Sequence, residues 1–303
     1  MNKQKVGVSV GIFAHNEEKN IEKIILSFYQ QKQESFYIDK IYVFSSGSTD
    51  NTNKIVRYLS KKYKNLYLIS KPKREGKSYD INEFLSIAEK DIIVISSADI
   101  ILDKCCLEYL IRPTINDEKV GLTQPRIVPK NSIDTFIGYV VNLQWNISNY
   151  INNITENVHT GELVVLRKII DSIPENVVND DAYIEFLIRK KGYKCIFVKE
   201  AVIFNKGPEN INDFIKQRRR IYAGYLELKN RFGYYVEPMN VSLILKVVIK
   251  FFPKDNPKKF LWYLGAIGLE AYARLLGMWD YYIKKKNHVV WEIAESTKKL
   301  EVK

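Results

Sequence analysis

A short run of apolar β-branched residues is the feature that most restricts the fold of this chain. Residues 92–95 read Ile-Ile-Val-Ile, with no alternation of polar and apolar positions. Such a run predicts a strand buried on both faces, as in the parallel sheets of α/β proteins. Asp99 follows soon after it, at the end where such sheets bind their ligands. A carboxylate there predicts either a ligand for a divalent cation or, with Asp103, a cap on the next helix.

Strand and helix patterns alternate in the first hundred residues. Apolar runs predict strands at 6–13, 38–44, 66–70 and 91–97, and helical periodicity predicts helices at 18–31, 53–59 and 75–90. Further on, we expect strands at 161–166, 193–198 and 201–204, and helices at 182–191 and from residue 211. The order implies right-handed crossovers and a Rossmann-like α/β fold, a mostly parallel sheet flanked by helices. The polar turns after the early strands should then meet at one edge of the sheet.

Composition limits the class of protein and its partners. A chain of 303 residues with 46% hydrophobic residues can bury a substantial core. Its three cysteines form no disulfide framework, and a strand pattern begins near the N-terminus without a signal peptide, so we expect a cytoplasmic location. The formal net charge is +12, and residues 241–303 hold 12 basic against 6 acidic side chains. A phosphorylated ligand, anionic lipid or nucleic acid could match this charge, but no nucleic-acid-binding motif is present, and we expect no such partner.

Six polar segments carry the chemistry. They are residues 8–18, residues 46–52, Gly76-Lys77 with Asn82, residues 97–99, Asp180-Asp181, and Gln217 with Arg220. In order and spacing they resemble glycosyltransferase family 2, enzymes of the GT-A fold, over roughly residues 6–230. Five positions depart from the family pattern: Phe13 replaces a usual proline, Ser45 and Ser46 replace a usual acidic pair, Ser97 replaces the first aspartate of Asp-x-Asp, and Ile221 replaces a tryptophan.

The resemblance implies a nucleotide-diphosphate sugar as donor and a divalent metal, Mg²⁺ or Mn²⁺, as cofactor. It assigns donor binding to seven residues: Ala14, Asn16, Glu17, Ser46, Lys77, Ser97 and Ala98. It assigns the metal to Asp99, and the diphosphate to Gln217, Arg219 and Arg220. Guanidinium groups in the 218–220 run and a metal would offset the charge that builds on a departing diphosphate.

The acceptor hydroxyl needs a general base, and the resemblance points to Asp181, with Asp180 as its neighbour. A single base and direct displacement imply inversion at the anomeric carbon. Two plainer interpretations stay open. The two aspartates could only cap a helix, and the run around Gln217 and Arg220 could be a solvated helix face. The main functional alternative is a non-catalytic GT-A-like protein that binds sugar nucleotides or lipids.

The tail differs from the rest of the chain. We expect a GT-A domain at 1–235 and a helical, basic and aromatic region at 236–303. The apolar stretches 241–252 and 260–278 contain charged residues, which makes them poor membrane spans. Flanking lysines and many aromatic residues favour an interfacial helical hairpin on an anionic membrane, and the alternative is a helical pair that covers the core. We therefore expect a peripheral protein at the inner face of the cell membrane, with a glycan or lipid-linked acceptor.

Overall fold

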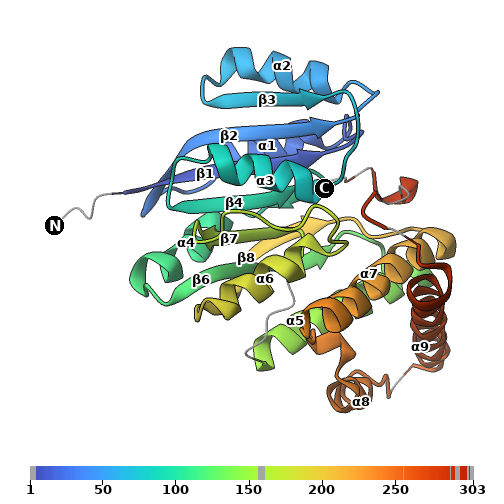
Figure 1. Cartoon of the computed structure of the whole chain (residues 1–303). Helices are drawn as coiled ribbons and strands as arrows, with labels where there is room; N and C mark the ends of the chain where they lie inside the picture. The colour runs from blue at the N-terminus through green and yellow to red at the C-terminus, as the bar shows by residue number, and fades with distance from the viewer. Residues whose placement is uncertain are drawn as a thin grey trace.

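The first half of the chain builds the parallel part of an eight-stranded sheet, whose strand order is β3-β2-β1-β4-β7-β6-β8-β5 (Figure 1). The computed structural model describes residues 5–155, 161–254, 256–286, 288–290, 294–298 and 300. Its first elements are β1 (Val6–Ala14), α1 (Ile21–Tyr29), β2 (Phe36–Ser46), α2 (Thr52–Lys62), β3 (Leu66–Lys71), α3 (Lys77–Ile87) and β4 (Ile92–Ser97). Strand β1 pairs in parallel with β2 and β4, and β2 pairs in parallel with β3. The predicted alternation of strands and helices is confirmed.

The described residues that follow β4 add four strands and four helices. They are β5 (Ile100–Leu102), α4 (Cys106–Asn116), β6 (Val120–Pro129), α5 (Phe136–Ile154), β7 (Leu163–Arg167), α6 (Asp180–Lys190), β8 (Lys194–Asn205) and α7 (Ile211–Phe232). Strand β7 runs antiparallel to both β4 and β6, so the sheet is mixed on this side. The expectation of two strands at 193–198 and 201–204 is wrong. They form one strand, β8, because an irregularity in its pairing with β6 absorbs the residues between them.

Two hydrophobic clusters, one on each face, enclose the sheet. Ile92 and Val94 belong to the cluster that includes residues of α1, α2 and α4. Ile93 and Ile95 belong to the cluster that includes residues of α3, α6 and α7. All four side chains are nearly inaccessible to solvent. Strand β4 is therefore buried on both faces, as its unbroken apolar run predicts.

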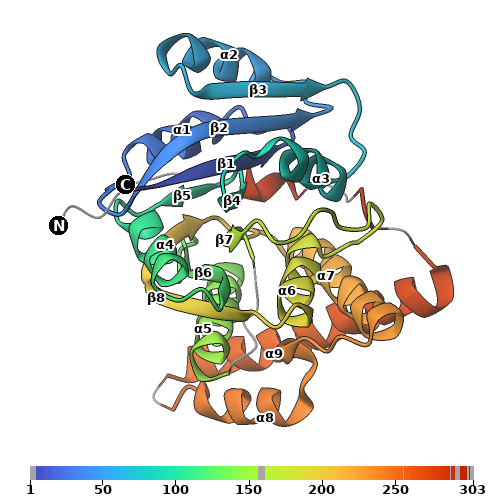
Figure 2. The same ribbon diagram turned by 60° about the vertical axis from the view of Figure 1, so that its left-hand side comes forward.

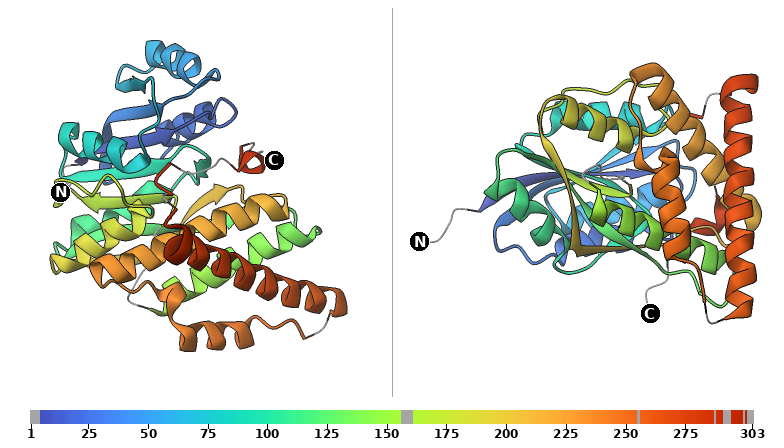
Figure 3. Two further views of the ribbon diagram at one scale, coloured as in Figure 1. Left: turned by 45° about the vertical axis from the view of Figure 1, so that its right-hand side comes forward. Right: turned by 90° about the horizontal axis from the view of Figure 1, so that it is seen from below.

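The C-terminal helices pack beside α7 and then lead the chain back to the sheet. They are η1 (Glu237–Met239), α8 (Val241–Lys250), α9 (Pro257–Met278), the π-helix η2 (Trp279–Lys284) and the short η3 (Glu295–Thr297). Helix α9 lies along the outside of the molecule next to α7 (Figure 3). Figures 1 and 2 show the red η3 segment beside the edge of the sheet where β1 ends. Within the described residues, no helix combines the length and apolarity that a membrane crossing requires.

Candidate active site

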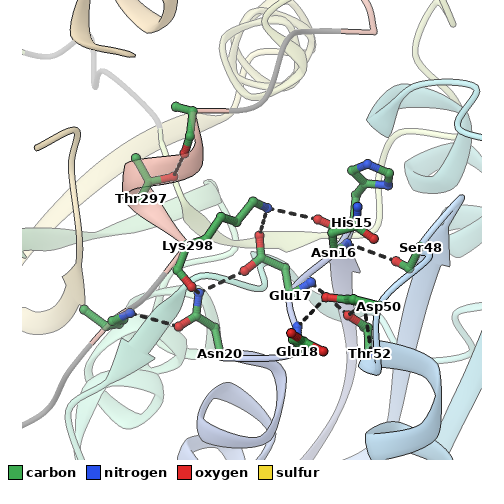
Figure 4. Close-up of polar contacts among 12 residues, drawn as sticks. His15, Asn16, Glu17, Glu18, Asn20, Ser48, Asp50, Thr52, Thr297 and Lys298 are labelled. Carbon is green, nitrogen blue, oxygen red and sulfur yellow. Dashed lines mark hydrogen bonds and ion pairs between the residues drawn. The ribbon is translucent and has the colours of Figure 1, made fainter. Parts of the chain in front are cut away.

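The turns after β1 and β2 are locked together by hydrogen bonds. Asn16 has a φ of +53°, a left-handed conformation that is uncommon outside glycine. Its backbone N–H donates to Ser48 Oγ at 3.1 Å, and its side-chain oxygen accepts from the Thr49 N–H at 2.8 Å (Figure 4). The Glu17 N–H donates to Thr52 Oγ1 at 2.8 Å. The strained backbone at Asn16 is therefore held by the second turn, and the expected convergence of the two turns is present.

The serine pair that replaces the family's acidic pair is buried. Ser46 Oγ donates to Asp80 Oδ2 at 2.6 Å, and the other oxygen of Asp80 accepts from Lys71 at 2.5 Å. Ser45 Oγ donates to Ser48 Oγ at 2.8 Å. Both serines are less than 5% exposed. Their hydroxyl groups thus link the turn to its own surroundings.

A cavity of about 350 Å³ opens at this edge of the sheet. Ten of the residues predicted for the site line it: Glu17, Lys77, Ser97, Ala98, Asp99, Asp180, Asp181, Gln217, Arg219 and Arg220. Ala14, Asn16 and Ser46 are not among the residues that line it. Helix α5 contributes Gln144 and Trp145, and the C-terminal segment contributes Thr297 and Lys298.

Carboxyl groups gather around the predicted metal ligand Asp99. The Ser97 N–H donates to the backbone oxygen of Glu162 at 2.8 Å, which brings the start of β7 next to the end of β4. Burial, followed by repulsion from Asp99, raises the pKa of Glu162 to about 7. The same two causes raise the pKa of Glu17 to about 7, although Lys298 opposes them. A cation beside Asp99 would relieve this repulsion.

The donor set near Asp99 fits a metal that is shared with a substrate. The described part of the chain contains no group of three His, Cys, Asp or Glu side chains that could hold a metal unaided. Mg²⁺ commonly binds through one or two carboxylates together with substrate phosphates and water. Asp99 lines the cavity and offers hard oxygen ligands, so the residues present fit that arrangement.

The acidic pair occupies the first turn of α6. Lys77 Nζ lies 3.0 Å from Asp180 Oδ2. Burial alone would lower the pKa of Lys77, but the charges of Asp180 and Asp181 outweigh it and the pKa is raised. Burial and the charge of Asp180 together raise the pKa of Asp181 from its ordinary value of 3.8 to about 6. The Ala182 N–H donates to Asp181 Oδ1 at 2.8 Å, so this aspartate interacts with the helix N-terminus while it faces the cavity.

Packing between α6 and α7 sets the acidic pair beside the Gln217–Arg220 segment. Asn179 Nδ2 donates to the backbone oxygen of Ile221 at 2.9 Å. A Cβ on Gly224 would lie 2.6 Å from the Asn179 side chain, so the close approach of the two helices depends on a glycine. The loop before α6 is also held by α3. The side-chain amide of Asn82 in α3 forms two hydrogen bonds of 2.8 Å with the backbone of Ile173 in that loop.

The match to known families agrees with this geometry. Residues 9–173 match the family described as Glycosyl transferase family 2, and residues 92–276 match Glycosyl transferase family group 2. The chain belongs to glycosyl transferase family 2. The predicted family and the predicted GT-A fold are thereby confirmed.

Two curated relatives of this family 2 chain come from bacteria. This chain is 27% identical over 242 residues to "Probable glycosyltransferase YdaM" of Bacillus subtilis. The matched region covers 73% of this chain and 56% of the relative. This chain is 26% identical over 249 residues to "Beta-monoglucosyldiacylglycerol synthase" of Nostoc sp., which covers 75% of this chain and 52% of the relative. The chain therefore spans about half the length of these relatives.

Solved structures share the fold of the family 2 chain. The mannosyltransferase PcManGT from Pyrobaculum calidifontis, in complex with GDP-Man and Mn²⁺, superposes with a TM-score of 0.61 at 21% identity, covering 94% of this chain and 82% of that one. Glucosyl-3-phosphoglycerate synthase from Mycobacterium tuberculosis, in complex with Mn²⁺ and UDP, gives a TM-score of 0.50 at 18% identity, covering 77% and 82%.

The three adjacent arginines of α7, residues 218–220, have different surroundings. Arg218 forms two hydrogen bonds of 2.8 Å with the Glu270 carboxylate, so its guanidinium group holds α9 against α7. Arg219 forms an ion pair with Asp280 of η2. Arg220 is half-buried, and the leading charges around it are those of Asp180 and Asp181. The predicted contact with a diphosphate rests most firmly on Arg220.

Several lining residues were not expected from the sequence, among them Trp145, Glu162 and Lys298. Glu162 directly precedes the apolar strand β7, and an acidic residue at a strand end was a detectable signal. Trp145 belongs to α5, whose many asparagines and β-branched residues give a poor helical pattern. Lys298 approaches the site from a distant part of the chain, which no local pattern reveals.

Proposed function

We propose that this chain is an inverting glycosyltransferase, which moves a sugar from a nucleotide-diphosphate sugar to a hydroxyl group of an acceptor. One observation carries the proposal. A single cavity is lined by the carboxylate at the end of β4, by the acidic pair of α6, and by the basic groups Lys77 and Arg220. A sugar nucleotide presents the complementary chemistry, which is a diphosphate for the cations and an anomeric carbon for the acceptor to attack.

In this proposal Asp181 is the general base. Its carboxylate would accept the proton of the acceptor hydroxyl as that oxygen attacks the anomeric carbon from the side opposite the diphosphate. With a pKa of about 6, Asp181 is ionised near neutral pH and is more basic than an ordinary aspartate. Its burial beside Asp180 supports the role, because both features make proton uptake more favourable.

The basic groups would stabilise the leaving diphosphate. Lys77 and Arg220 both line the cavity and both interact with the acidic pair, so they can attract phosphate oxygens to its vicinity. A Mg²⁺ or Mn²⁺ ion held by Asp99, with the donor's own phosphates as further ligands, would neutralise the remaining negative charge. Both similar solved structures were obtained with Mn²⁺.

The acceptor belongs to glycan or lipid chemistry, and the C-terminal helices favour a lipid-linked one at a membrane surface. Helix α8 exposes Val241, Leu245 and Ile249, spaced four residues apart and therefore on one face. Helix α9 exposes a second apolar stripe: Leu261, Leu264, Tyr272, Leu275, Trp279 at its end, and Tyr282 beyond it. Five exposed lysines accompany them: Lys246, Lys250, Lys254, Lys258 and Lys259. Apolar stripes with flanking lysines match an interfacial helix pair on an anionic bilayer.

Turnover of candidate donors tests the proposed function. The chain should release UDP or GDP from one of a panel of UDP- and GDP-sugars in the presence of Mn²⁺ and lipid extract. Removal of the metal with EDTA should abolish the release, and added Mn²⁺ or Mg²⁺ should restore it. A chain that binds a sugar nucleotide but neither transfers nor hydrolyses the sugar under any of these conditions would contradict the proposal and support a binding protein instead.

A further inference from the structure

The last part of the described chain lines the cavity next to the turn after β1. We call residues 294–298 and 300 the C-terminal strap. Lys298 Nζ donates to the backbone oxygen of His15 at 2.9 Å and forms an ion pair with the Glu17 carboxylate (Figure 4). The ammonium group thus lies at the turn that the resemblance assigns to the donor nucleotide, and Lys298 and Glu17 both line the cavity.

Anchors on both sides of Lys298 hold the strap in place. Asn20 of the turn before α1 uses both ends of its amide: it donates to the Lys298 backbone oxygen at 3.0 Å and accepts from the Leu300 N–H at 3.0 Å. Leu300 is fully buried. On the other side, Ser296 donates to the Asp213 carboxylate from its hydroxyl at 2.6 Å and from its N–H at 3.1 Å. The backbone around Lys298 is therefore held by the turn before α1 on one side and by α7 on the other.

Ser45 and Ser46, the last two residues of β2, leave recognition of the nucleoside unassigned. Their hydroxyl groups are buried and bonded to Asp80 and Ser48, so neither reaches the cavity. The cavity wall at the β1 turn instead presents a carboxylate, Glu17, and an ammonium group, Lys298. Lysine carries three N–H donors, and the contacts with His15 and Glu17 use two of them. The third can donate to an oxygen of a ligand.

We propose that Lys298 binds the nucleoside part of the donor, through an oxygen of the ribose or the base, and that the C-terminal strap holds it there. This inference rests on the proposed function, since it concerns the donor of the same reaction. Lys77 and Arg220 interact with the acidic pair of α6, whereas Lys298 interacts with the β1 turn. The basic groups of the cavity thus divide between the sugar-diphosphate and the nucleoside.

Calorimetric titration of the full chain with UDP, GDP and pyrophosphate, each with Mn²⁺, tests this inference. For Lys298→Ala, we expect the dissociation constant of UDP or GDP to rise roughly tenfold or more, as for the loss of a charge-assisted hydrogen bond. Pyrophosphate, which lacks a nucleoside, should bind as it does to the wild type. An equal loss of affinity for UDP and GDP would indicate that Lys298 contacts the ribose. An unequal loss of affinity would indicate that it contacts the base.

Three further variants separate a nucleoside contact from a structural role. Lys298→Arg should restore much of the affinity, because it keeps a cationic donor. Ser296→Ala, which removes an anchor of the strap outside the cavity, should weaken nucleotide binding less than Lys298→Ala does. Lys61→Ala, an exposed lysine of α2, should bind as the wild type does.

Several outcomes would overturn the inference. One is that Lys298→Ala binds both nucleotides with an affinity within about twofold of wild type. Another is that Lys298→Ala loses as much affinity for pyrophosphate as for the nucleotides. A third is that Lys298→Ala binds the nucleotides more tightly, which would mean that the strap competes with the ligand. Wild-type chain that binds neither UDP nor GDP would instead contradict the proposed function, and this inference with it. The melting temperature of each variant verifies that it is folded.

Discussion

Asp180 and Asp181 are neighbours in sequence, yet their surroundings assign them different roles. Asp180 lies 3.0 Å from the ammonium group of Lys77, so a fixed counter-charge accompanies it. Asp181 is half-buried next to that aspartate, and removal from water together with the charge of Asp180 raises its pKa to about 6. A paired carboxylate is suited to orienting its neighbours, whereas one with a raised pKa is suited to accepting a proton.

At the scale of single residues, Asp181→Asn should remove the base and leave the shape of the site unchanged. We expect kcat to fall by roughly 10²- to 10⁴-fold, the usual contribution of a general base. The affinity for UDP or GDP with Mn²⁺ should stay within about twofold of wild type, since the predicted nucleotide contacts lie elsewhere. Asp171→Asn, an exposed residue in the loop before α6, is the matched control and should keep full activity. Full activity in Asp181→Asn would refute the assignment.

The pH dependence of transfer follows from the same carboxyl group. A general base works only when deprotonated, and the Asp181 pKa of about 6 lies above its ordinary value of 3.8. The rate constant kcat/KM should therefore be level above pH 7 and fall by about tenfold per pH unit below pH 6. A profile that stays level to pH 4.5 would show that the base has an unshifted pKa, or that another group performs this step.

At the scale of elements, the local sequence pattern predicted those strands and turns whose burial or polarity depends on neighbouring residues alone. Strand β4 was found because both of its faces are buried, and the polar turns were placed correctly because parallel strands end at one edge. Helix α5 and strand β6 were missed, since asparagines and prolines interrupt their patterns. The contact between Arg218 and Glu270 joins residues 52 positions apart, and no periodicity signals such a pair. From its sequence alone, Arg218 is therefore expected to be a possible phosphate ligand.

The Arg218–Glu270 pair makes a stability prediction for α9. Burial alone would raise the pKa of Glu270, but Arg218 and Arg274 lower it to about 2, so the pair is charged at neutral pH. Glu270→Ala would leave the buried guanidinium group of Arg218 without this partner and should lower the free energy of unfolding by about 3 kcal/mol. Chemical denaturation followed by circular dichroism measures the change.

An exposed ion pair provides the control for that measurement. Glu89 contacts Lys40 at 2.6 Å, and its side chain is 59% exposed. Because water screens such a pair, Glu89→Ala should leave the denaturation midpoint nearly unchanged. Equal effects of Glu270→Ala and Glu89→Ala would show that the contact between α7 and α9 contributes no more than an ordinary surface pair.

At the scale of the whole molecule, the chain separates its polar and apolar surfaces. The cavity lies at the carboxyl edge of the parallel strands, while α8 and α9 lie on the side of the molecule opposite α2 (Figure 1). Both helices could be anticipated as amphipathic from sequence. The return of the strap to Glu17 could not, since Lys298 lies 281 residues from its partner. Only the folded chain shows that the region assigned to the tail also lines the cavity.

The proposed membrane contact makes the last prediction. Ile249 is 74% exposed on α8, and Lys250 follows it. Vesicles of phosphatidylglycerol and phosphatidylcholine should co-sediment the wild-type chain, and added salt should weaken the binding because it screens the lysines. A charge on the apolar face would oppose insertion among lipids, so Ile249→Asp should reduce the bound fraction several-fold at unchanged melting temperature.

A control substitution on the opposite side of the molecule distinguishes the loss of membrane insertion from a general effect of added negative charge. Tyr58 of α2 is 71% exposed, and Tyr58→Asp adds the same charge as Ile249→Asp. If α8 and α9 form the membrane-binding face, Tyr58→Asp should bind vesicles nearly as the wild type does. Equal losses in the two variants would mean that net charge alone governs binding. Absence of wild-type binding to anionic vesicles at low salt would refute the membrane contact, while leaving glycosyl transfer to a soluble acceptor intact.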